Sequence, residues 1–130
     1  MHLVYIVMGL ALVQYMYFAI AVGGARGRFG VTAPATSGHA VFDRYFRVQM
    51  NTLELIVVLI PALLLFANYV DARIAAGLGA VDIIGRFMYF RSYIADPSKR
   101  GPGFGLSLLP IAVLLIGGII GAALQVIHGT

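Results

Sequence analysis

The chain has 130 residues, of which 61% are hydrophobic and only 11% are charged, and its formal net charge is +4. Soluble domains typically carry about 25% charged residues, so this composition excludes an ordinary water-soluble protein and predicts an integral membrane protein. The absence of cysteine excludes disulfides, thiolate metal sites and a nucleophilic protein thiol.

Four apolar segments follow one another along the chain. A helix needs roughly 20 apolar residues to cross a bilayer, and each segment is long enough. The sequence therefore predicts an all-α, integral membrane four-helix bundle that forms a single domain over residues 1–130. The predicted helices lie near residues 3–22, 48–70, 74–95 and 104–127.

The four segments differ in charge. The first and fourth contain no charged residue, and the second is free of charge from Leu55 to Val70. The third contains Asp82, Arg86 and Arg91. We include it because it lies between two short polar loops, as a crossing helix would.

Basic residues are concentrated around the loops that follow the first and third segments. The loop between the second and third segments has Arg73 alone. By the positive-inside rule, the two basic loops are cytoplasmic and both termini lie on the other side. This asymmetry explains the pI of about 9.8 without a nucleic-acid partner, and it predicts a multi-pass membrane protein. The basic residues are Arg26, Arg28 and Arg44 near the first loop, and Lys99 and Arg100 in the third.

Polar residues recur at helical spacing where the second segment begins. Arg47, Asn51 and Glu54 stand at i, i+4 and i+7. Each residue of a helix advances by about 100°, so the three lie within about 60° of one another. They therefore form one polar stripe on a helix that is otherwise apolar.

The third segment has a similar stripe of Arg86, Tyr89 and Tyr93 at i, i+3 and i+7. Ionisable residues inside a membrane face a partner, a cavity or a ligand. Two interpretations follow from spacing alone. The stripes line a binding site, or they form a structural network in which Glu54 pairs with Arg86 or Arg47.

Three stretches together resemble the family of membrane-associated proteins in eicosanoid and glutathione metabolism, abbreviated MAPEG. They are ARGRFGVTAP at 25–34, FRVQMNTLE at 46–54 and GRFMYFRSYIADPSKR at 85–100. The family includes microsomal glutathione transferases and leukotriene C4 synthase. The resemblance covers nearly the whole chain and is closest to the bacterial type of microsomal glutathione transferase.

The resemblance implies a homotrimer of four-helix bundles with glutathione bound in clefts between subunits, near the cytoplasmic side. Glutathione is then the co-substrate, and a hydrophobic electrophile or a lipid hydroperoxide is the second substrate, reached from the membrane lipids. No metal is implied, and the three histidines have no paired spacing that would indicate a metal site. The implied activity is that of a membrane-bound glutathione S-transferase, with glutathione-dependent peroxidase activity as an addition.

The resemblance also implies roles for the polar residues of the first loop and second helix. Arg26, Arg47 and Gln49 are expected to contact the carboxylates and backbone of glutathione, because arginines make charge-assisted bonds to carboxylates. Glu54, together with Asn51, is expected to hold the γ-glutamyl end, where the carboxylate of Glu54 meets the ammonium group.

Further roles fall on the third helix and the loop after it. Tyr89 and Tyr93 are expected to line the cleft and donate hydrogen bonds, and Arg86 belongs to the same glutathione-binding set. Arg100 matches the arginine that the family uses to activate the sulfur. It is therefore the expected catalytic residue.

The chain departs from the family pattern at two positions. Leu55 stands where many glutathione-binding members have a tyrosine, and Gly27 stands where leukotriene C4 synthase has a second arginine. Two alternatives stay open: a protein of the same fold that binds lipid or glutathione without chemistry, and a small multidrug exporter. Such exporters have a glutamate in the first helix, where this chain has only Gln14 and tyrosines.

Overall fold

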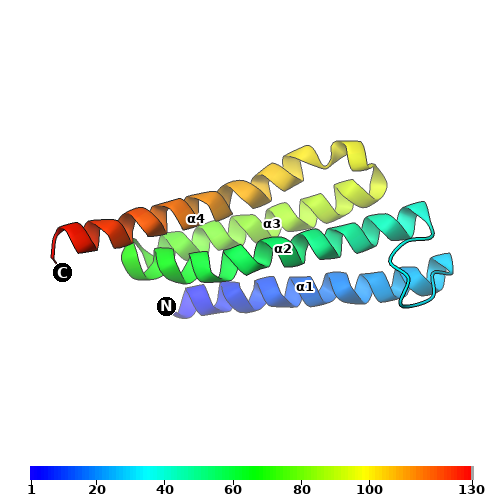
Figure 1. Cartoon of the computed structure of the whole chain (residues 1–130), viewed down its shortest axis with the longest axis horizontal. Coiled ribbons are helices and arrows are strands. Elements are labelled where there is room, and N and C mark those ends of the chain that lie inside the picture. The colour runs from blue at the N-terminus through cyan, green and yellow to red at the C-terminus, as the bar shows by residue number, and fades with distance from the viewer. Residues whose placement is uncertain (130) are drawn as a thin grey trace.

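A computed structural model describes residues 1–129 of the chain. It contains four long helices that run antiparallel in chain order and pack side by side (Figure 1), and no strand is present in the described part. The predicted all-α four-helix bundle is therefore confirmed. The helices are α1 (His2–Phe29), α2 (Ala40–Tyr69), α3 (Ala72–Ala95) and α4 (Gly101–Ile127), with a short 3-10 helix, η1 (Pro97–Lys99), before α4.

The helices α1 and α2 extend well beyond the apolar segments that predicted them. The end of α1 is set by Gly30, which adopts a left-handed φ of 70°. The start of α2 is set by His39, whose Nδ1 accepts a hydrogen bond from the N–H of Val41 at 3.1 Å. Hydropathy marks the part of a helix that lies in lipid, whereas these caps decide where the helix begins and ends.

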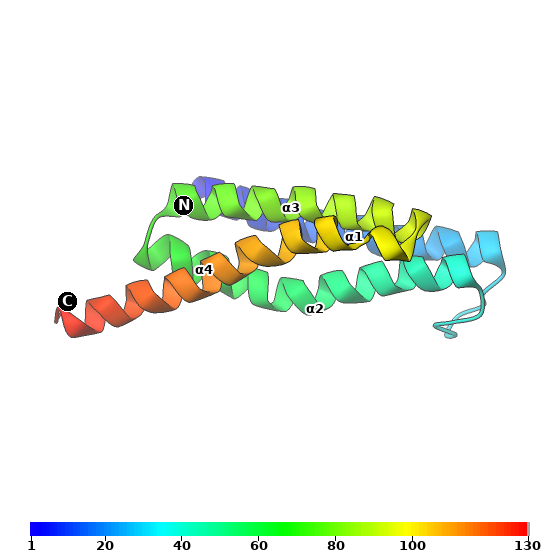
Figure 2. The same ribbon diagram turned by 90° about the horizontal axis from the view of Figure 1, so that it is seen from above.

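Three helices are long and apolar enough to cross a membrane by length and composition, namely α1, α2 and α4. The helix α3 has 24 residues, which span about 36 Å, enough for a hydrocarbon core of about 30 Å. It lies alongside the other three helices in two perpendicular views (Figures 1 and 2). We therefore treat α3 as the fourth crossing, in which Asp82 and Arg86 are enclosed by protein while Arg73 and Arg91, nearer the helix ends, are exposed.

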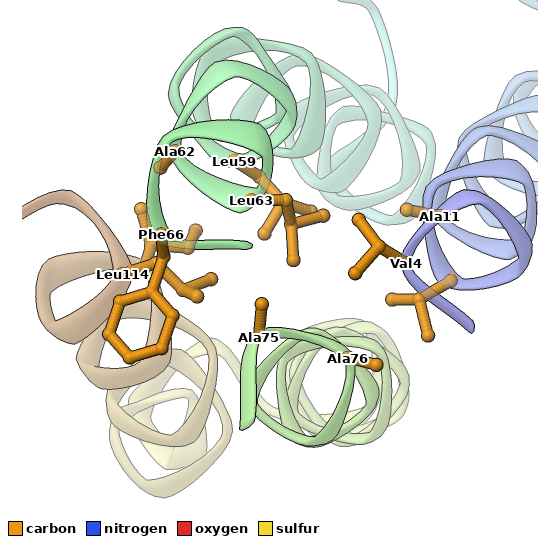
Figure 3. Packing of buried hydrophobic residues seen from close by; sticks show 11 residues of the cluster. Val4, Ala11, Leu59, Ala62, Leu63, Phe66, Ala75, Ala76 and Leu114 are labelled. Carbon is orange, nitrogen blue, oxygen red and sulfur yellow. The ribbon is translucent and has the colours of Figure 1, made fainter. Parts of the chain in front are cut away.

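The largest apolar core lies in the half of the bundle that holds the N-terminus and the connection between α2 and α3. Its side chains point into the space between the four helices (Figure 3), so each helix buries one face there. Members of this core include Val4 and Ala11 from α1, Leu59, Leu63 and Phe66 from α2, Ala75 and Ala76 from α3, and Leu114 from α4.

The backbones of α3 and α4 approach each other closely because two glycines lie at their contact. A Cβ atom added to Gly85 would lie 2.6 Å from the backbone nitrogen of Ser107, and one added to Gly103 would lie 2.5 Å from that of Tyr89. Small residues permit such close packing between membrane helices. This contact brings the Ser107 side chain of α4 directly onto α3.

The loop between α1 and α2 and the turn between α3 and α4 lie at the same end of the bundle, opposite the N-terminus (Figures 1 and 2). A sequence with four crossings requires this arrangement. Because the chain has no native cysteine, single cysteines can report which side each end faces.

We predict that Thr36→Cys and Lys99→Cys react with a membrane-impermeant maleimide from the cytoplasmic side, and that His2→Cys reacts only from the opposite side. The reason is the excess of arginine and lysine around the first two positions. Comparing the labelling of intact cells with that of inverted vesicles shows from which side of the membrane each cysteine reacts. Reaction of the Thr36 and Lys99 positions from opposite faces would contradict four crossings.

Candidate functional site

A polar pocket of about 320 Å³ lies between α2, α3 and the start of α4. Five of the predicted site residues line it together, although they come from two separate stretches of sequence. A sixth lining residue, Phe104, was not predicted, because nothing in the sequence distinguishes it from the other apolar residues of the fourth segment. The pocket is lined by Arg47, Asn51, Tyr89, Tyr93, Arg100 and Phe104.

The pocket is rich in hydrogen-bond donors and positive charge. Its walls offer two guanidinium groups, one amide and two phenol hydroxyls, and guanidinium groups pair well with carboxylates. The Tyr89 ring packs against Tyr93 and Phe104, with ring centroids 5.4 and 5.9 Å apart. The site therefore suits an anionic ligand that also presents hydrogen-bonding groups.

Arg100 enters the pocket from the turn between α3 and α4. The Ser98 hydroxyl and N–H both donate to the Asp96 carboxylate, and these bonds hold the pKa of Asp96 below its usual value. Arg100 Nη1 donates to the carbonyl of Pro97 at 2.9 Å. The rest of its guanidinium, on an exposed side chain, makes no other hydrogen bond or ion pair in the described chain and is available to a ligand.

Glu54 pairs with Arg47 and not with Arg86. Arg47 Nη1 lies 3.3 Å from Glu54 Oε1, and the two side chains are 53% and 57% exposed. An ion pair this exposed contributes only about 0–1 kcal/mol to stability. Both groups can therefore exchange partners at little cost when a ligand binds.

Arg86 lies beneath the pocket and is almost completely buried, at 2% exposure. Its Nη1 donates to Asn51 Oδ1 at 2.7 Å and to Thr52 Oγ1 at 3.2 Å, and its Nε donates to Ser107 Oγ at 2.7 Å. The Ser107 hydroxyl in turn donates to Asp82 Oδ1 at 2.8 Å. The guanidinium is thus joined to α2, α3 and α4.

This buried network balances charge inside the bundle. A single ionised residue at the centre of a membrane helix costs about 2.5–3.5 kcal/mol on insertion scales, and Asp82 neutralises Arg86 through the Ser107 hydroxyl. The opposite charges at i and i+4 on α3 were a signal for this pair in the sequence. Ser107 gave no such signal, because its role depends on how closely α4 approaches α3.

Arg26 and Gln49 do not line the pocket. Arg26 Nη1 donates to the carbonyl of Ala35 at 2.6 Å, and its guanidinium lies 5.0 Å from the centroid of the Phe42 ring. Gln49 follows Arg47 by two residues, or about 200° around α2, so it lies on the far side of the helix. The family resemblance assigned Arg26 and Gln49 to the same glutathione site as the other residues. Within one chain, however, both lie outside the pocket.

The described residues hold no group of three or more histidine, cysteine, aspartate or glutamate side chains that could bind a metal ion. The prediction of a site without metal stays a prediction.

The fold and site define an integral membrane four-helix protein with a donor-rich pocket at one end of the bundle. Residues 4–120 match the MAPEG family, and the chain belongs to this family. The resemblance seen in the sequence motifs is thereby confirmed.

Individual relatives agree with this assignment. The chain is 40% identical to human microsomal glutathione S-transferase 2 over 114 residues, which cover 88% of this chain and 78% of the relative. It is 43% identical to an uncharacterized protein of Synechocystis, over 88% of this chain and 84% of the relative. Rat leukotriene C4 synthase is more distant, at 27% identity over 93% of this chain and 81% of the relative.

We predict that Arg86→Leu destabilises the bundle far more than Arg47→Leu. Removing Arg86 leaves Asp82 buried without its opposite charge, a loss of about 3–5 kcal/mol, whereas the exposed pair of Arg47 is worth about 0–1 kcal/mol. Thermal unfolding in detergent measures both, and Asp82→Asn combined with Arg86→Leu should recover part of the loss. Equal melting temperatures for the two single variants would contradict the assignment.

Proposed function

We propose that the protein is a membrane-bound glutathione S-transferase that stabilises the glutathione thiolate for attack on hydrophobic electrophiles. The observation that carries this proposal is the pocket in which Arg47, Asn51, Tyr89, Tyr93 and Arg100 meet. The identity of 40% to a human microsomal glutathione S-transferase supports it.

The chemistry of glutathione fits the donors and charges of the site. The peptide has two carboxylates, one ammonium group and one thiol. In our proposal Arg47 binds a carboxylate of glutathione, and Tyr89 and Tyr93 donate hydrogen bonds to it. The ion pair between Arg47 and Glu54 opens when glutathione binds, and the Glu54 carboxylate then pairs with the ammonium group. Arg86 contributes from beneath the pocket through its contacts with Asn51 and Tyr89.

A homotrimer would complete the site. Gln49 faces away from the pocket of its own chain, and Arg26 lies near the end of α1, outside that pocket. We propose that both residues reach the glutathione held by a neighbouring subunit, so that each ligand lies between two chains. In such a trimer, one side of α2 contributes to the pocket of its own subunit, and the other side contributes to the pocket of the neighbouring subunit.

Arg100 is the proposed catalytic residue. A free thiol has a pKa of about 8.5 and is mostly protonated near neutrality, whereas the thiolate is the nucleophile. An adjacent guanidinium favours the thiolate after the proton has passed to water, and a shift of two pKa units requires about 2.7 kcal/mol. The sulfur then forms a bond to the electrophile as the leaving group departs.

Peroxide reduction is a second activity of the same thiolate, with a lipid hydroperoxide in place of the electrophile. A protein of this fold that binds glutathione or lipid without chemistry is the main alternative. The presence of Arg100 in the pocket favours the enzyme, and family membership gives no support to a multidrug exporter. We place the protein in the bacterial inner membrane, with the pocket toward the cytoplasm.

We predict that calorimetry detects glutathione binding to the purified protein, and that Glu54→Gln weakens it by about 1.5–3 kcal/mol without changing assembly or melting temperature. The loss is that of one hydrogen bond between charged groups. Asp71→Gln, which alters a carboxylate at the other end of the bundle, is the control for affinity. If Glu54→Gln lowers stability and leaves affinity unchanged, Glu54 has a structural role.

We predict that Arg100→Ala keeps most of the glutathione affinity but loses the ultraviolet thiolate absorbance at pH 7 and most turnover with a chlorinated nitrobenzene or a lipid hydroperoxide. Raising the pH toward the free thiol pKa of about 8.5 should partly restore the rate, because the thiol then ionises without the arginine. Lys99→Ala, the adjacent cation, should retain both signals. A variant at Arg100 with normal absorbance and turnover would refute this role.

A further inference from the structure

Two residues outside the pocket, Asp82 and Ser107, are connected to it by an unbroken series of hydrogen bonds. The series runs from the Asp82 carboxylate through the Ser107 hydroxyl and the Arg86 guanidinium to the Asn51 amide, with lengths of 2.8, 2.7 and 2.7 Å. We infer that Asp82 and Ser107 are positioning residues that, through Arg86, fix which atoms of Asn51 face the ligand. The identity of that ligand rests on the proposed function.

The direction of each bond in the series is determined by chemistry. A serine hydroxyl has one proton, and here that proton goes to Asp82, which leaves the lone pairs of the oxygen to accept from Arg86 Nε. A guanidinium can only donate. The amide atom of Asn51 that faces Arg86 must therefore be the oxygen.

This orientation leaves the two Nδ2 hydrogens of Asn51 for the pocket that it lines. At this point the pocket offers donors, so it selects a ligand group that accepts hydrogen bonds and rejects an ammonium group. For glutathione, the carboxylate of the γ-glutamyl end belongs at Asn51. Its ammonium group belongs at Glu54, one turn further along α2.

The same guanidinium also supports the aromatic wall. It lies 4.5 Å from the centroid of the Tyr89 ring and 6.0 Å from that of Phe104, and both rings line the pocket. Asp82, Ser107 and Arg86 are 2%, 0% and 2% exposed. Because water has little access to compete for these bonds, the orientation is fixed before a ligand arrives.

A spectroscopic test of the orientation does not depend on glutathione. The chain has two asparagines, Asn51 and Asn68, so asparagine labelled with ¹⁵N in the side-chain amide gives two signals, which Asn68→Asp assigns. Ser107→Ala should shift and broaden the Asn51 signal and leave that of Asn68 in place. Leu63→Ala, which opens the buried core near the other end, is the control that destabilises the bundle without touching the series. An unchanged Asn51 signal in Ser107→Ala would overturn the inference.

A binding test addresses the ligand group. Ser107→Ala should weaken glutathione binding about threefold to tenfold, the range for one lost hydrogen bond, and should weaken binding of an analogue lacking the γ-glutamyl carboxylate less than about twofold. Asp82→Asn retains an acceptor for Ser107, so its effect should be smaller. Equal losses for glutathione and the analogue would overturn the assignment of Asn51. If the unmodified protein binds no glutathione, the proposed function fails, and the amide signal alone decides the positioning role.

Discussion

The Arg86 guanidinium is buried among three helices of a membrane protein, where neither water nor lipid can solvate it. Its position requires a compensating charge and hydrogen-bond acceptors. Asp82 supplies the charge, Ser107 accepts from Nε and Asn51 accepts from Nη1, whereas the buried Nη2 has no partner among the described residues. Most of the polar architecture follows from this requirement. Asn51 and Tyr89, which line the pocket, both contact the Arg86 guanidinium directly.

Close packing of α3 and α4 makes this compensation geometrically attainable. With any side chain larger than hydrogen at Gly85, the backbone of α4 would be displaced and Ser107 would move away from Arg86. A single small residue therefore couples the packing of the bundle to its electrostatics. The apolar core extends from here toward the other end, and its members Ala11, Leu59 and Ile111 line one small cavity together with Asp82 and Arg86.

Much of the fold was predictable, because hydropathy and the bilayer thickness determine how many helices there are and roughly where they lie. The ends of the helices could not be predicted from hydropathy, because they depend on caps such as His39 and Gly30 that lie outside the apolar segments. The meeting of Arg47, Asn51 and Tyr89 followed from helical spacing and family resemblance. The roles of Ser107 and Phe104 required the approach of α4 to α3, which no periodicity in one helix encodes.

Within one chain, α1 contributes no residue to the pocket, whose walls come from α2, α3, α4 and the turn before α4. Its outward face is instead strongly apolar and exposed, with Ile6, Val13 and Ile20 among its members. Apart from its last turns, the first helix can thus accumulate substitutions that alter its contacts with lipid without changing the walls of this pocket. Natural variation could adapt such a protein to a thicker or thinner membrane while its binding preferences stayed constant.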